Sequence, residues 1–435
     1  MTATEPAGAQ APDFDTIDFY TDPSLVEDPY PYFEHWRNKC PVAHWPHHDV
    51  IAVTGYEESA EIYRQTETFS SANAVTGPFP GLPVEPEGDD ITDLIIEHRH
   101  VFPMFEYLVT LDPPEHTQQR GLTMRLFTPK RMAENEEFMQ GLAHRQIDEF
   151  IGNGTFEVLA DLGKPIALLV IADLLGLPEA DHKRLARLFA GLPEVGDEEG
   201  AATFGDPLAF LAETFAGYLE DRRANPRDDV LTQIAQATYP DGSLPEIADV
   251  VRTASFLFAA GQETTAKLVS GSLKYVAEEP HWWEWLREDR SRIPGFLEEV
   301  LRMESPVKST SRLVRHTTEI GGVEMPAGTT LAVCPGAANR DPRHFPNPDE
   351  FDPTRANARE HLAFGRGVHA CPGAPLARVE AKIVMNALLD RIESLKLNEE
   401  AHGTGPDFRH DYEPTYILRG LTRLVIDFVP KDPAS

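Results

Sequence analysis

A single long helix constrains the fold more than any other feature of this sequence. Ser243 and Glu246 have the spacing of a capping box, Pro245 lies in the first turn, and the apolar pattern continues to Pro280. At about 1.5 Å per residue, such a helix would be roughly 50 Å long, the width of a whole domain. The sequence therefore predicts a helix that crosses the core.

The middle of this predicted helix changes from apolar to polar. Gly261 lies where glycine costs about 1 kcal/mol relative to alanine, and a polar run over residues 262–265 directly follows the apolar residues 256–260. A threonine hydroxyl that competes for the helix carbonyls, such as that of Thr264, can open a local bulge. A solvated helix turn is the alternative interpretation.

The rest of the chain predicts a mainly α protein with small peripheral β-sheets. Helical periodicity dominates from Asp112 to about residue 310, and strand patterns occur on either side of it. The predicted strands are residues 50–54, 329–334 and 422–429, with a tight Gly-Gly hairpin at 320–323.

The length of 435 residues would suggest about two or three domains, but no Gly/Ser-rich or Pro-rich linker divides the chain. Hydrophobic residues make up 41% of the sequence, which suffices for one large core. We therefore predict a single domain over residues 15–430, with a disordered tail over 1–14 and a short C-terminal tail over 431–435.

Composition restricts the compartment and the partners. The three cysteines form no Cys-x-x-Cys pair, which argues for a reducing compartment and against structural zinc. A formal charge of −32 disfavours nucleic acid and anionic membranes as partners. Residues 1–12 lack basic residues, and the longest apolar stretch, 166–172, is too short to span a bilayer. We expect a cytoplasmic monomer.

The segment 364–373 carries the strongest chemical signal. Cys371 has glycines before and after it and His369 two positions upstream. Glycines let the backbone approach a large flat cofactor, and N–H groups pointing inward stabilise an anionic sulfur ligand. A small buried cysteine in a Gly-rich turn is the alternative.

The pattern Phe-Gly-x-Gly-x-His-x-Cys-x-Gly is filled by Phe364, Gly365, Gly367, His369, Cys371 and Gly373. The chain thereby resembles the soluble bacterial cytochrome P-450 monooxygenases. The resemblance extends from about Tyr20 to Phe428 and implies a triangular, prism-like helical domain around haem b. It makes Cys371 the proximal ligand of the haem iron, where thiolate donation favours O–O cleavage.

The resemblance also assigns roles on the long helix. Small Ala260 and Gly261 would leave room beside the haem for O₂, Thr264 would hydrogen-bond the bound oxygen, and Glu263 would relay protons from solvent.

Further roles follow from the same resemblance. The haem propionates would be held by His116, Arg120, Arg312 and His369. Glu299 and Arg302 would form a structural pair that grips the loop over residues 339–355. The substrate would be faced by residues 79–107, 185–210 and 307–310, by Phe256 and Ala259, and by Tyr416 and Ile417.

Two stretches without acidic residues, 116–133 and 361–379, interrupt the negative charge. An acidic ferredoxin would dock on their cations, which are Arg120, Arg125, Lys130, Arg131 and Arg366. Chance together with propionate binding is the alternative.

The leading functional hypothesis is a monooxygenase that inserts one oxygen atom from O₂ into a hydrophobic molecule. Terpenoids, steroids, fatty acids and aromatic compounds all suit this hypothesis. Electrons would come from NAD(P)H through a ferredoxin reductase and ferredoxin, because the sequence shows no flavin or iron–sulfur module. A peroxide-dependent relative and a non-catalytic haem sensor or carrier are the alternatives.

Overall fold

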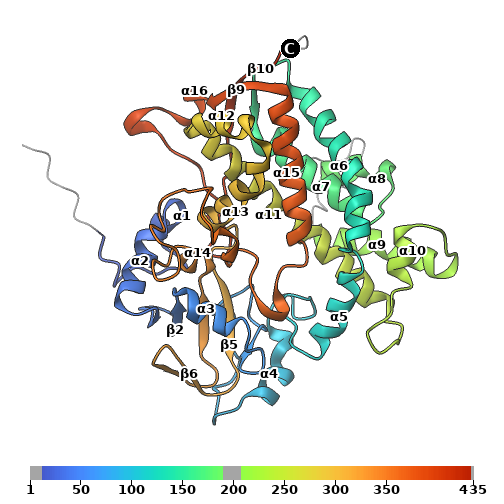
Figure 1. Cartoon of the computed structure of the whole chain (residues 1–435). Helices are drawn as coiled ribbons and strands as arrows, with labels where there is room; N and C mark the ends of the chain where they lie inside the picture. Colours follow the sequence, from blue (N-terminus) through green and yellow to red (C-terminus); the bar gives the residue numbers. More distant parts are fainter. Residues whose placement is uncertain (1–11, 190–206, 433–435) are drawn as a thin grey trace, which may run out of the picture.

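The computed structural model describes residues 12–189 and 207–432 (Figure 1). In these ranges the chain is mainly α-helical with small sheets, as predicted. The predicted tails lie largely outside the described residues, and the single domain over 15–430 stays a prediction. No helix in the described ranges is long and apolar enough to cross a membrane.

The helices are α1 (Ser24–Glu27), α2 (Tyr30–Lys39), α3 (Tyr56–Ile62), α4 (Thr92–His98), α5 (Glu115–Met124), α6 (Pro129–Phe150), α7 (Lys164–Leu174), α8 (Glu179–Phe189), α9 (Pro207–Ala224), α10 (Val230–Ala235), α11 (Ile247–Glu278), α12 (His281–Glu288), α13 (Ile293–Glu304), α14 (Pro335–Ala338), α15 (Ala374–Arg391) and α16 (Glu399–His402). The strands are β1 (Val42–His44), β2 (Val50–Val53), β3 (Phe69–Ser70), β4 (Thr155–Glu157), β5 (Thr310–Val314), β6 (Thr318–Ile320), β7 (Val323–Met325), β8 (Thr330–Val333), β9 (Ile392–Leu397) and β10 (Val425–Pro430).

The predicted strands are confirmed as β2, β8 and β10, and the hairpin as β6 and β7. Gly321 and Gly322 join the hairpin with φ of +61° and +80°, values that a primed two-residue turn requires. The largest sheet has the order β1-β2-β8-β5-β3. In it β2 and β8 are parallel, and Val50 is paired with Thr330.

The long central helix is confirmed as α11, which has 32 residues and is therefore about 48 Å long. It runs through the middle of the molecule, with α15 in front of it (Figure 1). Helices α7, α9, α13 and α15 all pack against it. Because α11 is covered on several sides, most of its apolar residues are buried.

The predicted capping box at the start of α11 is wrong. The helix begins at Ile247, and Glu246 caps it without a side-chain hydrogen bond. The Ser243 hydroxyl donates instead to Asp241 Oδ1 at 2.6 Å, and the Ser243 N–H donates to the same oxygen at 2.9 Å. Because the Asp241 side chain competes for these donors, the segment forms a local turn before the helix starts.

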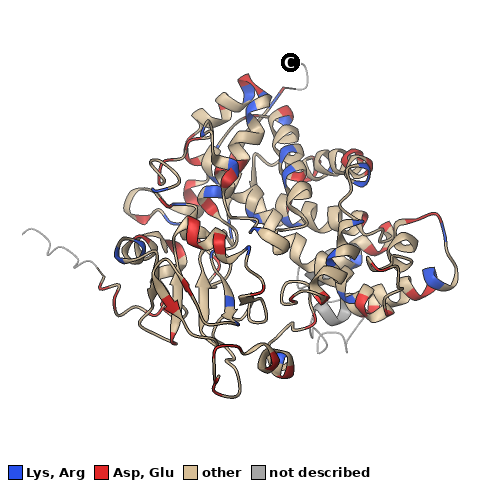
Figure 2. Cartoon of the chain, turned by 60° about the horizontal axis from the view of Figure 1, so that its bottom comes forward, with Lys and Arg blue, Asp and Glu red and all other residues tan. Residues whose placement is uncertain are grey.

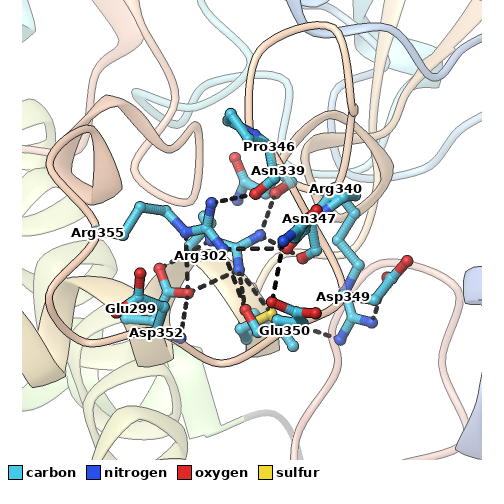
Figure 3. Close-up of polar contacts among 12 residues, drawn as sticks. Glu299, Arg302, Asn339, Arg340, Pro346, Asn347, Asp349, Glu350, Asp352 and Arg355 are labelled. Carbon is cyan, nitrogen blue, oxygen red and sulfur yellow. Dashed lines mark hydrogen bonds and ion pairs between the residues drawn. The ribbon is translucent and has the colours of Figure 1, made fainter.

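The ion pair of Glu299 and Arg302 on α13 fixes the loop over residues 339–355, as expected (Figure 3). Both side chains are 0% exposed. Arg302 donates to the Glu299 carboxylate at 2.7 and 2.8 Å, and to the carbonyl oxygens of Asn339 at 2.9 Å and Pro348 at 2.7 Å. Arg355 Nε also donates to Glu299 Oε1, at 3.2 Å.

We predict that Arg302→Met lowers the free energy of unfolding by about 3–5 kcal/mol, because it leaves the buried Glu299 carboxylate without its main partner. Urea unfolding followed by circular dichroism measures this loss. Arg391→Met is the control, since Arg391 pairs with Asp148 at the surface, where a pair is worth about 1 kcal/mol or less. Equal losses in the two variants would contradict the structural role of Arg302.

Candidate active site

A cavity of about 320 Å³ lies between α5, α7, α11, α15 and the cysteine loop, residues 362–373. Its wall is mostly apolar, with Ile171 from α7 and Phe256, Leu257 and Leu268 from α11. Its size and apolar character are those of sites that enclose small organic molecules.

Most of the predicted site residues meet in this cavity. The predicted residues in its lining are His116, Arg120, Ala260, Gly261, Thr264, Arg312, Phe364, Gly365, His369, Cys371 and Gly373. Two predicted site residues, Glu263 and Gly367, do not line it.

The cysteine loop has a backbone path that needs its glycines. Gly365 and Gly367 have φ of +64° and +70°, which residues other than glycine rarely adopt. A Cβ at Gly367 would also overlap the carbonyl oxygen of Tyr63. The loop closes where the Cys371 N–H donates to the carbonyl oxygen of Phe364 at 2.8 Å. Gly367 therefore shapes the loop without touching the cavity.

The Cys371 side chain is exposed where it faces the cavity. Desolvation by the protein around it raises the pKa of its thiol. The backbone N–H groups of Gly373 and Ala374 and the guanidinium groups of Arg120 and Arg378 oppose this rise. Because desolvation dominates, a positive charge in the cavity would be needed to hold the sulfur as a thiolate. A metal cofactor would supply that charge.

A second buried network supports this loop from α13 and α15. Glu298 accepts hydrogen bonds from Arg378 at 2.6 Å and from His361 Nε2 at 3.1 Å. Burial alone would raise the pKa of Glu298, but the bonds from His361 and Arg378 lower it to about 2. The Arg378 guanidinium carbon also lies 4.7 Å from the centre of the Phe364 ring. Glu298 is therefore a fixed anion beside the cysteine loop.

On α11, which also lines the cavity, the Thr264 hydroxyl donates to the Ala260 carbonyl oxygen at 3.0 Å. The helix remains α-helical throughout, so the bulge considered from the sequence is not present. A Cβ on Gly261 would lie 3.6 Å from Ile171 Cγ1, an ordinary contact. Packing against α7 therefore does not demand the glycine, and its effect is to leave space in the cavity.

Glu263 points away from the cavity lining. Its side chain is 60% exposed, and its carboxylate lies 3.6 Å from Lys267 Nζ. Glu263 is therefore in contact with solvent, and the next residue, Thr264, lines the cavity.

Two histidines meet at the edge of the cavity, with the ring centres of His116 and His369 4.1 Å apart. Burial and nearby cations, Arg120 for His116 and Arg312 for His369, lower their pKa values to about 4 and about 2. His369 Nε2 also lies 3.1 Å from the Ser71 hydroxyl. Both rings are therefore neutral at pH 7.

In the described part of the chain, no carboxylate forms an ion pair with these histidines or with Arg120 and Arg312. Both ring nitrogens of His116 are buried without a hydrogen-bond partner. Within residues 12–189 and 207–432, neither Arg120 nor Arg312 forms an ion pair, and burial lowers the pKa of each. Buried cations without counter-charges are costly. The cluster therefore suits a ligand with carboxylates, such as the propionates of haem.

Sequence reasoning missed Glu380, a buried acid in the cavity wall. It lies on the same face of α15 as Leu376 and Ala377, which also line the cavity. Burial raises the pKa of Glu380 to about 8, so its carboxyl group is mostly protonated at pH 7. Helical periodicity places Glu380, four residues after Leu376 and three after Ala377, on this face.

The residues expected to face substrate are only partly in the cavity. Phe256, Val307 and Thr310 line it, and Leu108 and Val109 do so just beyond the predicted stretch 79–107. The predicted residues outside the lining are the whole stretch 79–107, Ala259, Lys308, Ser309, Tyr416 and Ile417. In the stretch 185–210, Leu185 is buried in the core, and residues 190–206 lie outside the described residues.

Comparison with known proteins gives consistent matches. A family model described as Cytochrome P450 matches residues 206–402. The biotin biosynthesis cytochrome P450 of Bacillus subtilis is 31% identical over 93% of this chain and 97% of its own length. The 6-deoxyerythronolide B hydroxylase of Saccharopolyspora erythraea is 29% identical over 87% of this chain and 90% of its own length.

A solved structure is more similar still. The substrate-free structure of Mycobacterium marinum cytochrome P450 CYP150A6 has a TM-score of 0.91 and 53% sequence identity. The match covers 97% of this chain and 100% of that chain.

We predict that Cys371→Ser removes the red-shifted Soret band expected of the reduced, carbon monoxide-bound protein, because a neutral alcohol cannot replace the sulfur anion. Absorption spectroscopy measures the band. Cys40→Ser is the control, since Cys40 lies outside the cavity lining and should leave the band unchanged. A Cys371→Ser protein that kept the band would rule out this cysteine as the ligand.

Proposed function

Because the chain belongs to the cytochrome P450 family and is a monooxygenase, we propose that it binds an uncharged, apolar organic molecule in this cavity and oxidises it there. One atom of O₂ enters the substrate and the other leaves as water, so each turnover consumes two electrons from NAD(P)H and two protons. The family implies haem held through a cysteine thiolate, and we propose haem b, which supplies the activation of O₂. The observation that carries the proposal is one apolar cavity lined by both Cys371 and Thr264.

The haem would be held by residues of the cavity lining. Cys371 would ligate the iron. His116, whose ring nitrogens have no hydrogen-bond partner, would bind the propionates together with Arg120 and Arg312. His369, which is held by Ser71, would complete this set.

Thr264 and Glu263 would deliver the protons. The Thr264 hydroxyl lies on the cavity wall and can turn from the Ala260 carbonyl to donate into the cavity. Glu263 is exposed and adjacent in sequence, so it can take protons from water and pass them toward Thr264.

The charge of the cavity favours a neutral substrate. The cations in its described lining are Arg120 and Arg312, which the propionates would occupy, and Arg366, which donates to Tyr56 Oη at 2.7 Å. Lys308 is buried away from the cavity, with Nζ 5.6 Å from the Phe19 ring centre. Residues 190–206 contain no Lys, Arg or His in the sequence. A substrate carboxylate would therefore be buried without a partner, at a cost of several kcal/mol.

We predict that the methyl ester of a medium-chain fatty acid binds at least about tenfold more tightly than the free acid, because the acid must desolvate its charge. Spectral titration measures both affinities, and product formation with NADH, a ferredoxin reductase and ferredoxin tests turnover. The variant Lys308→Met should leave both affinities unchanged. Tight binding of the acid that Lys308→Met alone weakens would overturn the proposed substrate class.

We propose an acidic ferredoxin as the electron donor, docked beside α5. Of the five cations considered from the sequence, Arg125 and Lys130 remain exposed, Lys130 with 85% of its side chain. Arg120 and Arg366 line the cavity, and Arg131 donates to the Leu174 carbonyl oxygen. Acidic residues are spread over most of the remaining elements (Figure 2). The docking face is therefore smaller than the sequence suggested.

We predict that Arg125→Glu slows reduction by ferredoxin at low ionic strength by about tenfold, and that this difference shrinks as salt screens the charges. Stopped-flow absorption measures the rate. Lys396→Glu is the control, because this exposed residue lies on β9, at the opposite end of Figure 1 from α5. The same rate in both variants would contradict docking beside α5.

A further inference from the structure

Lys267 of α11 lies between two carboxylates. It follows Glu263 by one helical turn, and its side chain is only 6% exposed. The Lys267 Nζ atom is 3.6 Å from Glu263 Oε2 but 2.5 Å from Glu413 Oε2. One ammonium group thus serves two acids at unequal distances.

The C-terminal segment around Glu413 is shaped to receive Lys267. The Glu413 N–H donates to the carbonyl oxygen of Gly420 at 3.0 Å, and Tyr412 bridges Leu421 in antiparallel fashion. A Cβ on Gly420 would overlap the aliphatic stem of Lys267. The glycine and the acid of one short hairpin therefore hold the lysine stem and its charge together.

The unequal distances decide which acid is held. Coulomb attraction falls with distance and is weaker in water than in a buried setting. Glu413 is closer to Lys267 and only 27% exposed, whereas Glu263 is 60% exposed. The electrostatic attraction of Lys267 to Glu413 is therefore stronger than its attraction to Glu263, which is held only weakly.

We propose that Glu413 is a positioning residue that holds Lys267 in the shorter of its two ion pairs, so that the Glu263 carboxylate, in the longer one, stays free to move protons between water and Thr264. This inference rests on the proposed function, because it assigns a partner to the proposed proton relay. It gives the hairpin over residues 411–422 a part in oxygen chemistry although Glu413 does not line the cavity.

The arrangement predicts that removing the charge of Glu413 impairs proton delivery and that removing Lys267 as well restores it. In Glu413→Gln, Lys267 turns to Glu263 and holds it as a carboxylate, so proton delivery slows and more of the electrons are lost as hydrogen peroxide. In Glu413→Gln combined with Lys267→Met, nothing holds Glu263 and delivery recovers. Damage to packing alone would instead accumulate in the double variant.

The first experiment needs no turnover. Glu263→Cys places a thiol at the relay position, and the pH dependence of its alkylation rate gives the thiol pKa, with Cys40→Ser as background. Glu413→Gln should lower this pKa by about half a unit when Lys267 is present, and by clearly less in the Lys267→Met background, where only the direct effect of Glu413 remains. Equal shifts in the two backgrounds would overturn the proposal.

The second experiment measures hydrogen peroxide released per NADH consumed. Glu413→Gln should raise this ratio about twofold or more, whereas Glu413→Asp, the double variant with Lys267→Met and the exposed control Glu279→Gln should match the original protein. A double variant as uncoupled as Glu413→Gln would refute the role of Lys267. If the original protein formed no product with NADH and ferredoxin, the proposed function would be wrong. The thiol pKa measured in the first experiment would still test the contact of Lys267 with Glu413.

Discussion

The cysteine loop depends on two neighbouring glutamates of α13. Glu299 binds Arg302, which fixes the carbonyl oxygens of the segment ahead of the loop, and Asn339 in that segment accepts the Leu362 N–H at 2.6 Å. Glu298 holds His361 at the start of the loop and Arg378 beyond its end. Buried charges favour folding only when their hydrogen bonds are satisfied, and here the partners all come from segments that frame the cysteine. The hydrogen bonds that these two buried carboxylates require therefore fix the segments on either side of Cys371 and so its position.

Charge is distributed unevenly in this protein. The chain carries a formal charge of −32, yet the cavity gathers Arg120 and Arg312 without carboxylate partners. Leaving these cations unpaired costs free energy, which an anionic ligand would recover. A cofactor with carboxylates would therefore stabilise the folded chain as well as equip it for chemistry, since any ligand that binds only the native state raises stability.

Residue patterns within short segments predicted the local structure correctly. Contacts between segments that are distant in the sequence could not be predicted. The cysteine loop, the length of α11 and the Gly-Gly hairpin follow from residue spacing, and the structure contains all three. The capping box is absent because the Ser243 hydroxyl donates to Asp241, two residues earlier, instead of capping the helix. Lys308 belongs to the stretch 307–310 that was expected to face substrate, but its ammonium group packs over the Phe19 ring instead. The contact of Lys267 with Glu413 has no signature in either local sequence, because tertiary packing alone brings them together.

The parallel pairing of β2 with β8 has a consequence for how the chain is made. Val50 leaves the ribosome long before its partner Thr330 has been synthesised, so β1 and β2 wait with an open edge while the helical middle of the chain emerges. Such edges attract other strands, and contacts between distant residues form slowly. The N-terminal quarter of this protein is therefore the part most exposed to aggregation during synthesis, and the part whose protection by chaperones would matter most.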